Sequence, residues 1–322
     1  MLDLVDKRIV VTGGAGFLGR FVVDTLRERG VAEDRIFVPR RDDYDLTQES
    51  HVIRLYDDAE PDVVIHLAAE VGGIGANRTH PGRFFFANAS MGLHLIEHGR
   101  QRGIQKFVQT GTVCAYPKFA AVPFNENELW DGFPEETNAP YGVAKKSLFV
   151  MLDGYAREYG LHSAVVLPVN LYGPHDNFDL ETSHVIPALI RKCVEARKAG
   201  DEAIECWGTG SASREFLFVE DAAEAIVTAA EKMEDPTPIN LGTGKEITIK
   251  NLVELVARLC RFEGEIRWDP TKPDGQPRRC LDTTKAKRLM GWQAQVDFEE
   301  GLSRTIAWFE QHQAEVREVV YG

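Results

Sequence analysis

The chain has 322 residues, of which 43% are hydrophobic, and it carries a formal net charge of −13. This length allows one elaborate domain or two lobes around large buried cores. The acidic charge argues against nucleic acid or an anionic membrane as a partner, because both are polyanions that bind basic surfaces. No apolar run approaches the roughly 20 residues of a membrane span, and no secretory signal is recognised before the first strand.

The cysteines are few and irregularly spaced. Their number is odd, and they lack the Cys-x-x-Cys or Cys/His spacing of metal ligands; they are Cys114, Cys193, Cys206, Cys260 and Cys280. We therefore expect no disulfide framework and no metal site, and a reducing cytoplasm suits the chain best.

The first element is a short apolar strand that leads into a glycine-rich turn. Residues 8–12 are followed by Gly13-Gly-Ala-Gly16-Phe-Leu-Gly19 and by an amphipathic pattern over residues 17–29. Glycines at this spacing permit a tight turn, close approach of a pyrophosphate and close packing of the helix on the strand. Although glycines alone could mark a structural turn, the strand and helix around them favour dinucleotide binding at the helix N-terminus.

The second strand, residues 35–38, ends in Pro39-Arg40-Arg41-Asp42-Asp43. A carboxylate about twenty residues after the glycines would select NAD by binding the ribose hydroxyls. Arginine stands there instead, and a guanidinium can form a bidentate pair with a 2′-phosphate. NADP is therefore favoured, while Asp42 and Asp43 leave NAD open.

Helix and strand patterns then alternate along the chain. Strands are expected at residues 62–69, 106–110 and 163–168, and a helix from Pro81 to near Gly103. His66 lies inside the third strand, and we interpret it as a satisfied core histidine. The alternation predicts an α/β fold with a doubly wound parallel sheet, which binds ligands at the carboxyl ends of its strands. The loop at residues 71–76, Thr112 and Cys114 would lie at that edge.

A further helix is expected to begin near Tyr141, because Pro140 suits the first turn of a helix. Tyr141 and Lys145 are four residues apart and therefore share one helix face. A free tyrosine has a pKa of about 10, and we expect the neighbouring ammonium to lower it towards neutral pH. A Tyr-x-x-x-Lys spacing often arises by coincidence, but Thr112 and the glycine turn at the same edge favour a functional pair.

The chain then leaves the first lobe. Residues 170–178 are expected to form a polar loop, and an apolar helix begins after Ser183. Residues 214–221 and 238–244 are interpreted as returns to the first lobe, with a helix at 222–232 between them. The predicted domains are 1–170 with 215–242 for the dinucleotide, and 171–214 with 243–322 for a smaller mixed α/β substrate lobe. Each of its cationic residues alone is equally typical of a solvated helix face, but together with an aromatic residue they suit a nucleotide diphosphate. These residues are Arg191, Lys192, Arg197, Lys198, Trp207, Arg214, Arg278 and Arg279.

With Thr112, Tyr141 and Lys145 in this order, the chain resembles the extended short-chain dehydrogenase/reductase family. Several stretches are similar to the branch of that family that acts on GDP-4-keto-6-deoxymannose: Val71-Gly-Gly-Ile-Gly-Ala-Asn, Cys114-Ala-Tyr-Pro-Lys, Asn170-Leu-Tyr-Gly-Pro-His-Asp-Asn-Phe, Ser183-His-Val-Ile-Pro-Ala-Leu and Trp268-Asp-Pro-Thr-Lys-Pro-Asp-Gly. The resemblance implies 3,5-epimerisation followed by NADPH-dependent reduction at C4.

The resemblance also implies roles for individual residues. It places hydride chemistry at Thr112, Tyr141 and Lys145, and epimerisation at Cys114 and His184. A thiol with a pKa of about 8.5 is mostly protonated at neutral pH, so Cys114 would need positive surroundings to act as a base. Cofactor contacts are expected at Gly13, Gly16, Phe17, Leu18, Gly19, Arg41, Thr110, Lys145, Pro168, Asn170, Leu171 and His184. Substrate contacts are expected at Lys192, Trp207, Arg214 and Asp274.

Two departures from the family pattern leave the sugar and the nucleotide open. Val113 stands where a second serine is usual, and Lys192 stands where an arginine would bind phosphate bidentately. A sugar 4,6-dehydratase would need an Asp-Glu pair where Val113 and Cys114 stand, and a non-enzymatic NADP sensor would not need Tyr141 and Lys145. An epimerase that acts on another sugar without net reduction remains the alternative.

A homodimer is also expected. The helices near residues 83–102 and 141–160 carry apolar residues on more than one face, namely Phe84, Phe85, Phe86, Leu148, Phe149 and Leu152. A helix that is buried on one side needs a single apolar stripe. The resembled family often dimerises through such helices, although these residues could equally be covered within the chain.

Overall fold

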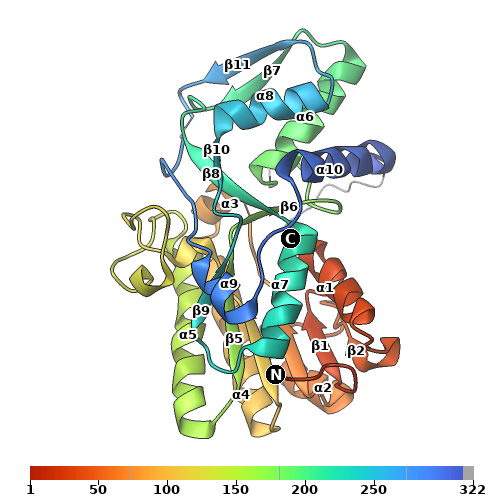
Figure 1. Ribbon diagram of the computed structural model, residues 1–322, viewed down its shortest axis with the longest axis vertical. Coiled ribbons are helices and arrows are strands. Elements are labelled where there is room, and N and C mark those ends of the chain that lie inside the picture. The colour runs from red at the N-terminus through yellow and green to blue at the C-terminus, as the bar shows by residue number, and fades with distance from the viewer. Residues whose placement is uncertain (73, 181, 273, 315–322) are drawn as a thin grey trace.

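The computed structural model describes residues 1–72, 74–180, 182–272 and 274–314, which form a larger and a smaller lobe (Figure 1). The larger lobe is built on a six-stranded parallel sheet in the order β2-β1-β3-β4-β5-β9. Its strands are β1 (Ile9–Thr12), β2 (Ile36–Phe37), β3 (Val63–His66), β4 (Lys106–Thr110), β5 (Ser163–Pro168) and β9 (Pro238–Leu241). Strands β1, β3, β4 and β5 are buried throughout, which explains their almost continuous apolar sequences.

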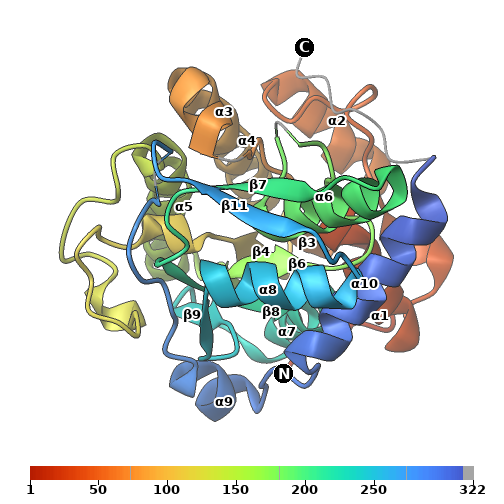
Figure 2. The same cartoon turned by 90° about the horizontal axis from the view of Figure 1, so that it is seen from above.

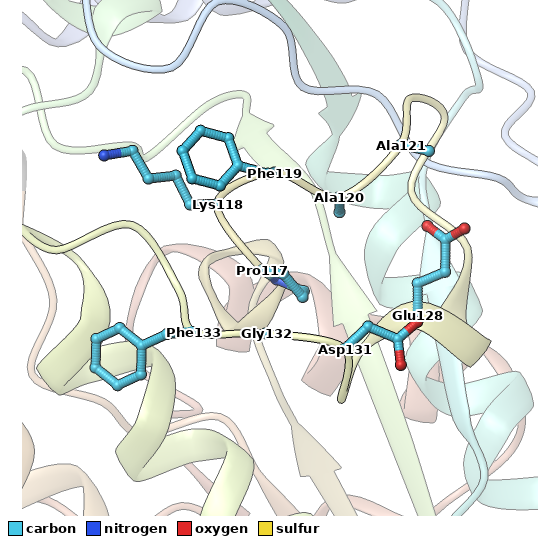
Figure 3. A pocket seen from close by; sticks show the side chains of 9 residues that line it. All are labelled: Pro117, Lys118, Phe119, Ala120, Ala121, Glu128, Asp131, Gly132 and Phe133. Atoms are coloured by element: carbon cyan, nitrogen blue, oxygen red, sulfur yellow. The ribbon is translucent and has the colours of Figure 1, made fainter.

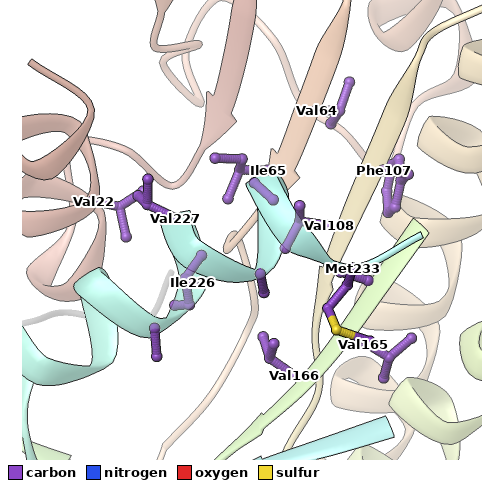
Figure 4. Packing of buried hydrophobic residues seen from close by; sticks show 14 of the residues in the cluster. Val22, Val64, Ile65, Phe107, Val108, Val165, Val166, Ile226, Val227 and Met233 are labelled. Atoms are coloured by element: carbon purple, nitrogen blue, oxygen red, sulfur yellow. The ribbon is translucent and has the colours of Figure 1, made fainter. Parts of the chain in front are cut away.

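Helices cover both faces of this sheet. On one face α1 (Phe17–Glu28) packs beside α7 (Val219–Lys232), and on the other lie α2 (Glu49–Ala59), α4 (Pro81–Gln101) and α5 (Ala139–Tyr159). Figure 4 shows Ile226 and Val227 of α7 among buried residues that include Val22, Ile65 and Val108. The prediction of a doubly wound α/β sheet is therefore confirmed, and the arrangement is Rossmann-like.

Among the described residues, the smaller lobe contains two small sheets and three helices, seen from above in Figure 2. One sheet has the order β10-β8-β6, with β8 (Ser213–Phe218) between β10 (Glu246–Thr248) and β6 (Asn170–Tyr172). The other pairs β7 (Ala203–Trp207) with β11 (Glu265–Asp269). The helices are α6 (Val185–Ala199), α8 (Ile249–Leu259) and α10 (Phe298–His312), and they enclose a second buried cluster that includes Ile190, Val256 and Phe309.

Three elements differ from the sequence predictions. Residues Asn170–Tyr172 form strand β6 rather than the start of a loop. Strand β8 pairs with β6 and β10 instead of returning to the large sheet, whereas β9 does return as its edge strand. The expected loop at residues 71–76 continues into the short helix α3 (Ile74–Thr79), and Gly73 lies outside the described residues.

The predicted division of the chain into two domains stays a prediction. Helix α9 (Thr284–Met290) belongs to the range assigned to the substrate lobe, yet its Ala286 and Met290 are buried in the cluster of the larger lobe. Across the described part of the chain, no helix combines the length and the apolar character needed to cross a membrane.

Candidate functional site

The glycine-rich turn lies between β1 and α1 and depends on missing side chains. Gly13 has φ of +72°, in the left-handed region that glycine adopts without strain. A Cβ at Gly19 would lie 2.0 Å from the carbonyl oxygen of Gly13, so α1 can pack this closely only with glycine at that position. Phe17 and Leu18 form the first turn of α1, beside the Gly16 cap.

A cavity of about 380 Å³ opens beside this turn. It is lined by glycine-turn residues, by the segment after β2 and by the end of β3, namely Gly13, Ala15, Gly16, Pro39, Arg40, Arg41, Tyr44, Asp45, Leu46, Thr47, Ala68, Ala69, Glu70 and Met91. A helix N-terminus, close backbone and adjacent guanidinium groups together fit a dinucleotide.

Arg41 occupies the cavity wall where a 2′-phosphate would need a partner. Its Nη2 donates to Oε1 of Glu70 at 3.2 Å, and most of its side chain is exposed. Asp42 and Asp43, which left NAD open, do not line the cavity. The residues present therefore fit a 2′-phosphorylated cofactor better than an unphosphorylated one.

The start of α5 is fixed by a carboxylate turn. Glu135 accepts hydrogen bonds from Thr137 Oγ1 at 2.5 Å and from Asn138 Nδ2 at 2.7 Å. The helix begins at Ala139 with Pro140 in its first turn, which confirms the predicted start. Gly142 then touches the segment after β4, because a Cβ there would lie 2.3 Å from the carbonyl oxygen of Cys114. This contact brings Tyr141 beside the 3₁₀ turn Val113–Ala115.

Thr112 links the two segments of the site. Its Oγ1 accepts the backbone N–H of Cys114 at 3.1 Å, which caps the 3₁₀ turn. Burial and the nearby Cys114 raise the pKa of Tyr141, and the side-chain hydrogen bond with Thr112 opposes that shift. The sequence predicted a lowered pKa, and that prediction is wrong for this structure, because burial of the phenol outweighs its favourable partners.

Lys145 is deeply buried. Only 1% of the residue is exposed, and burial lowers the pKa of its ammonium from 10.5 to about 8. No carboxylate in the described ranges lies within ion-pair distance of it. Burial and the charge of Lys145 hold the pKa of His66 well below its ordinary value.

His66 is only partly satisfied. Its Nδ1 lies 2.8 Å from Thr12 Oγ1, whereas its buried Nε2 has no hydrogen-bond partner among the described residues. The interpretation of His66 as a core histidine is confirmed by its complete burial, but only one of its two ring nitrogens is hydrogen-bonded among the described residues.

His184 caps the N-terminus of α6. Its side chain keeps access to solvent, yet the surrounding protein lowers the pKa of the imidazole through burial. No hydrogen bond within the described part of the chain connects it to Cys114. The structure thus unites Thr112, Cys114 and Tyr141 closely, and leaves His184 at the start of another helix.

Several of the expected cofactor residues lie at or just after the carboxyl ends of the parallel strands. Thr110 and Pro168 end β4 and β5, and Asn170 and Leu171 lie in β6. Thr110 Oγ1 is buried without a partner in the described residues, and Asn170 Nδ2 donates to the carbonyl of Glu215 at 2.9 Å.

The expected substrate residues gather in the smaller lobe. Asp274 accepts the backbone N–H of Thr209 at 2.7 Å, and Arg214 Nη2 donates to the carbonyl of Asp274 at 3.2 Å. Trp207 ends β7 with its ring largely exposed and with Lys272 Nζ 5.4 Å from the ring centroid. Lys192 Nζ donates to the carbonyl of Glu205 on the same strand at 2.9 Å. The smaller lobe thus contains the exposed ring of Trp207 together with the cationic side chains of Lys192 and Arg214.

Sequence reasoning missed two residues that shape this site. Gly142 gave a signal, because a glycine inside a helix often marks a close approach. Arg279 was recognised only as a positive charge, and the structure places its Nη1 3.9 Å from the sulfur of Cys114. No sequence signal could show that contact, since the two residues are far apart in the chain.

A second hollow, of about 300 Å³, lies in the loops between residues 117 and 133 (Figure 3). Its walls include Lys118, Phe119, Glu128 and Phe133, none of which is an expected site residue. Thr112, Cys114 and Tyr141 do not line this hollow.

The chain is similar to known proteins over most of its length. The family model described as "NAD dependent epimerase/dehydratase family" matches residues 9–242. GDP-L-fucose synthase 1 of Arabidopsis thaliana is 39% identical over 94% of this chain and 93% of its own length. The GDP-L-fucose synthase of Escherichia coli is 37% identical over 97% and 99%. A crystal structure of a GDP-L-fucose synthetase from Naegleria fowleri bound to NADP has a TM-score of 0.88 and 27% identity, with 97% of both chains covered.

We expect Gly142→Ala to destabilise the protein by about 1–3 kcal/mol, because the added methyl group collides with the backbone of Cys114. Thermal denaturation measures this effect. Gly154→Ala, in the same helix, is the matched control: its Cβ would meet nothing within 4 Å, so it should hold or raise stability by up to about 1 kcal/mol. Equal stabilities of the two variants would contradict the close contact.

We expect Lys145 to make folding stability depend on alkaline pH. Its pKa falls from 10.5 in the unfolded chain to about 8 in the folded protein, so the unfolded chain binds more protons between these values. Stability therefore rises with pH across that window, by about 2 kcal/mol between pH 7 and pH 10. Urea denaturation of the parent and of Lys145→Met at both pH values isolates this contribution. The prediction fails if the difference between the two proteins is independent of pH.

Proposed function

We propose a function for a chain that belongs to the NAD dependent epimerase/dehydratase family: 3,5-epimerisation of a GDP-4-keto-6-deoxy sugar followed by NADPH-dependent reduction at C4, as in GDP-L-fucose synthase. The observation that carries this proposal is the meeting of Thr112, Cys114 and Tyr141 where α5 touches the turn after β4. The relatives favour this reaction over an epimerase without net reduction, because those named for GDP-L-fucose synthesis match nearly the whole chain.

The reduction uses the Tyr141 side of the site. NADPH, held by the glycine turn after β1 and by Arg41, would supply the hydride for C4. Tyr141 keeps its proton at neutral pH because its pKa is raised, so it can donate that proton to the C4 oxygen. Thr112 binds the same oxygen, and the buried Lys145 ammonium stabilises negative charge that develops on the phenol.

The epimerisation uses the Cys114 side. The thiolate of Cys114 takes the proton from a carbon next to the ketone, and the electron pair of the broken C–H bond moves into the enolate. Thr112 and Tyr141 hold the enolate oxygen by hydrogen bonds. His184 returns a proton to the opposite face of the carbon, so the configuration inverts.

The nucleotide diphosphate is assigned to the smaller lobe. Arg214 and Lys192 supply positive charge, and Trp207 offers an exposed ring on which a base can stack. The carboxylate of Asp274 holds the Thr209 turn that follows Trp207. Lys192 cannot bind phosphate through two parallel N–H bonds as arginine does, so the orientation of the diphosphate depends mainly on Arg214.

We expect Cys114→Ser to separate the two reactions. A hydroxyl is a far weaker base than a thiolate, so exchange of the C3 and C5 protons of GDP-4-keto-6-deoxymannose with deuterated water should fall by at least about 100-fold. Direct reduction of the unepimerised ketone should survive. NMR of the products measures both, and exchange at the parental rate would return Cys114 to the role of a small core residue.

Tyr141→Phe should have the opposite effect. We expect NADPH oxidation by the ketone to be nearly abolished, because the phenylalanine ring cannot donate a proton to the C4 oxygen. Some C–H exchange should persist, since Thr112 still binds the enolate oxygen. Absorbance at the NADPH band follows the first reaction and NMR the second. Equal loss of both reactions would mean that they share their acid.

We expect Arg41→Ala to weaken NADPH binding while leaving NADH binding nearly unchanged, because only NADPH carries the 2′-phosphate. Losing a charge-assisted pair of this kind costs about 1.5–3 kcal/mol. Fluorescence titration of both cofactors measures the gap. Arg35→Ala is the matched control, since Arg35 precedes β2 and donates to the carbonyl of Asp6 at 2.6 Å. Equal affinities of the parent for both cofactors would refute the assignment to NADPH.

A homodimer formed through α4 and α5 completes the proposal. Of the apolar residues that suggested it, Phe84, Leu148, Phe149 and Leu152 are buried within the chain. Phe86 is 61% exposed, and the same two helices also expose Phe85, Leu93, Val150 and Tyr159. These side chains form an apolar face that a second copy can cover.

We expect light scattering at micromolar concentration to give twice the chain mass of 36.0 kDa. Phe86→Glu should shift the protein towards monomer, because it introduces a charge into the apolar face. Phe119→Glu serves as a control, since Phe119 is 89% exposed on the loop next to the second hollow. A monomeric parent would dispose of the dimer.

A further inference from the structure

The segment around Arg279 crosses from the smaller lobe to the neighbourhood of Cys114. Its backbone is held along β8, where Ser213 N–H donates to the carbonyl of Pro277 at 2.9 Å and Glu215 N–H to the carbonyl of Arg279 at 3.1 Å. On the other side, Phe124 N–H donates to the carbonyl of Cys280 at 2.8 Å. These hydrogen bonds fix the backbone on both sides and therefore the point from which the Arg279 side chain leaves it.

The Arg279 guanidinium reaches the thiol. Nη1 donates towards Cys114 Sγ at 3.9 Å, and Nη2 donates to Gln276 Oε1 at 3.1 Å. Gln276 is itself anchored, since its Nε2 donates to the carbonyl of Lys118 at 3.0 Å, four residues beyond Cys114. The glutamine therefore holds the guanidinium against the segment that carries the thiol.

The charge of Arg279 is not neutralised by a neighbouring acid. In the part of the chain that the structure describes, no carboxylate lies within ion-pair distance of it, and its buried Nε has no hydrogen-bond partner. The adjacent Arg278 differs: it is exposed and pairs with Glu246. Two consecutive arginines thus have opposite environments, and only the second presents an unpaired charge to the sulfur.

A cation beside a thiol favours the thiolate, which is the form that accepts a proton. We propose that Arg279 is a positioning residue for Cys114, delivered by the smaller lobe to direct the sulfur at the substrate and to stabilise the thiolate that acts as the base. This inference rests on the proposed role of Cys114 as a base. When the thiolate takes the proton from carbon, an S–H bond forms and the negative charge moves to the enolate oxygen.

A competing role for Arg279 is binding of the substrate diphosphate. Arg214 lies nearby, and burial together with the charge of Arg279 lowers the pKa of Arg214 to about 10. Two close cations would suit an anion. Removal of Arg279 distinguishes the two roles. If Arg279 acts on the thiol, its removal changes the reactivity of Cys114 even without substrate. If Arg279 binds the diphosphate, its removal changes the KM.

The first test measures thiol reactivity without substrate. Iodoacetamide is added at pH 7, and mass spectrometry follows carboxamidomethylation of Cys114, which is distinguishable because the other four cysteines are buried. We expect Arg279→Met to slow alkylation of Cys114 by about tenfold, as the thiolate fraction falls. Arg279→Lys should retain most of the rate, and the matched control Arg278→Met should retain all of it. An unchanged rate in Arg279→Met overturns the proposal, and Arg279→Gln replaces that variant if it does not fold.

The second test measures exchange of the C3 and C5 protons at saturating GDP-4-keto-6-deoxymannose. We expect Arg279→Met to lower the exchange rate by about tenfold with less than about a threefold change in KM, since the loss lies in the base. A raised KM with an unchanged rate at saturation would instead identify a diphosphate ligand and overturn the proposal. If Cys114→Ser exchanges at the parental rate, the proposed function of Cys114 fails, while the alkylation rates still decide whether Arg279 controls the thiol.

Discussion

The buried carboxylate of Glu215 is a contact that joins segments of the two lobes. Its Oε1 accepts the backbone N–H of Gly244 at 2.7 Å, and its Oε2 accepts that of Leu281 at 2.6 Å. Burial raises the pKa of this carboxyl, and the backbone donors oppose the shift. An unsatisfied carboxylate at this depth would be costly, so the three segments are stable mainly in the arrangement that supplies its donors. Arg214 and Arg279 lie on two of these segments, and their positions follow from it.

The site concentrates positive charge in a chain whose net charge is −13. Burial lowers the pKa values of Lys145 and Arg214, because the protein interior disfavours the charged form of each side chain. Asp274 does not neutralise Arg214 through an ion pair, because Arg214 binds its backbone carbonyl while the carboxylate is engaged by Thr209. Such burial of charge lowers stability, and the anionic substrate of the proposed reaction would offset that cost on binding.

The sequence predicted the parts of this structure that depend on local patterns. The strands follow from their apolar sequence pattern, and the turn after β1 follows from the conformational freedom of glycine. The start of α5 follows from the fixed φ of Pro140. What it missed depends on contacts between distant segments. The pairing of β8 with β6 and β10 could not be read from β8 itself, since its buried apolar residues would suit either sheet.

The electrostatic errors have the same origin. The spacing of Tyr141 and Lys145 identified the pair, yet the pKa of Tyr141 is raised because the degree of burial depends on the whole fold. Spacing shows which groups can meet, whereas burial decides how they titrate. The same reason hid the contact between Arg279 and Cys114, which joins residues from the two lobes.

The two proposed reactions depend on the lobes to different degrees. Tyr141, Lys145 and Thr112 all belong to the larger lobe, and the contact of Gly142 with Cys114 holds their segments together without help from the smaller lobe. Cys114, the proposed base, also lies beside the guanidinium of Arg279, and Glu215 binds the segment that carries this arginine. A change in the relative position of the lobes would therefore disturb proton removal from carbon before it disturbed proton donation to the C4 oxygen. The order of the reactions fits this dependence, because epimerisation requires the more completely assembled site and comes first.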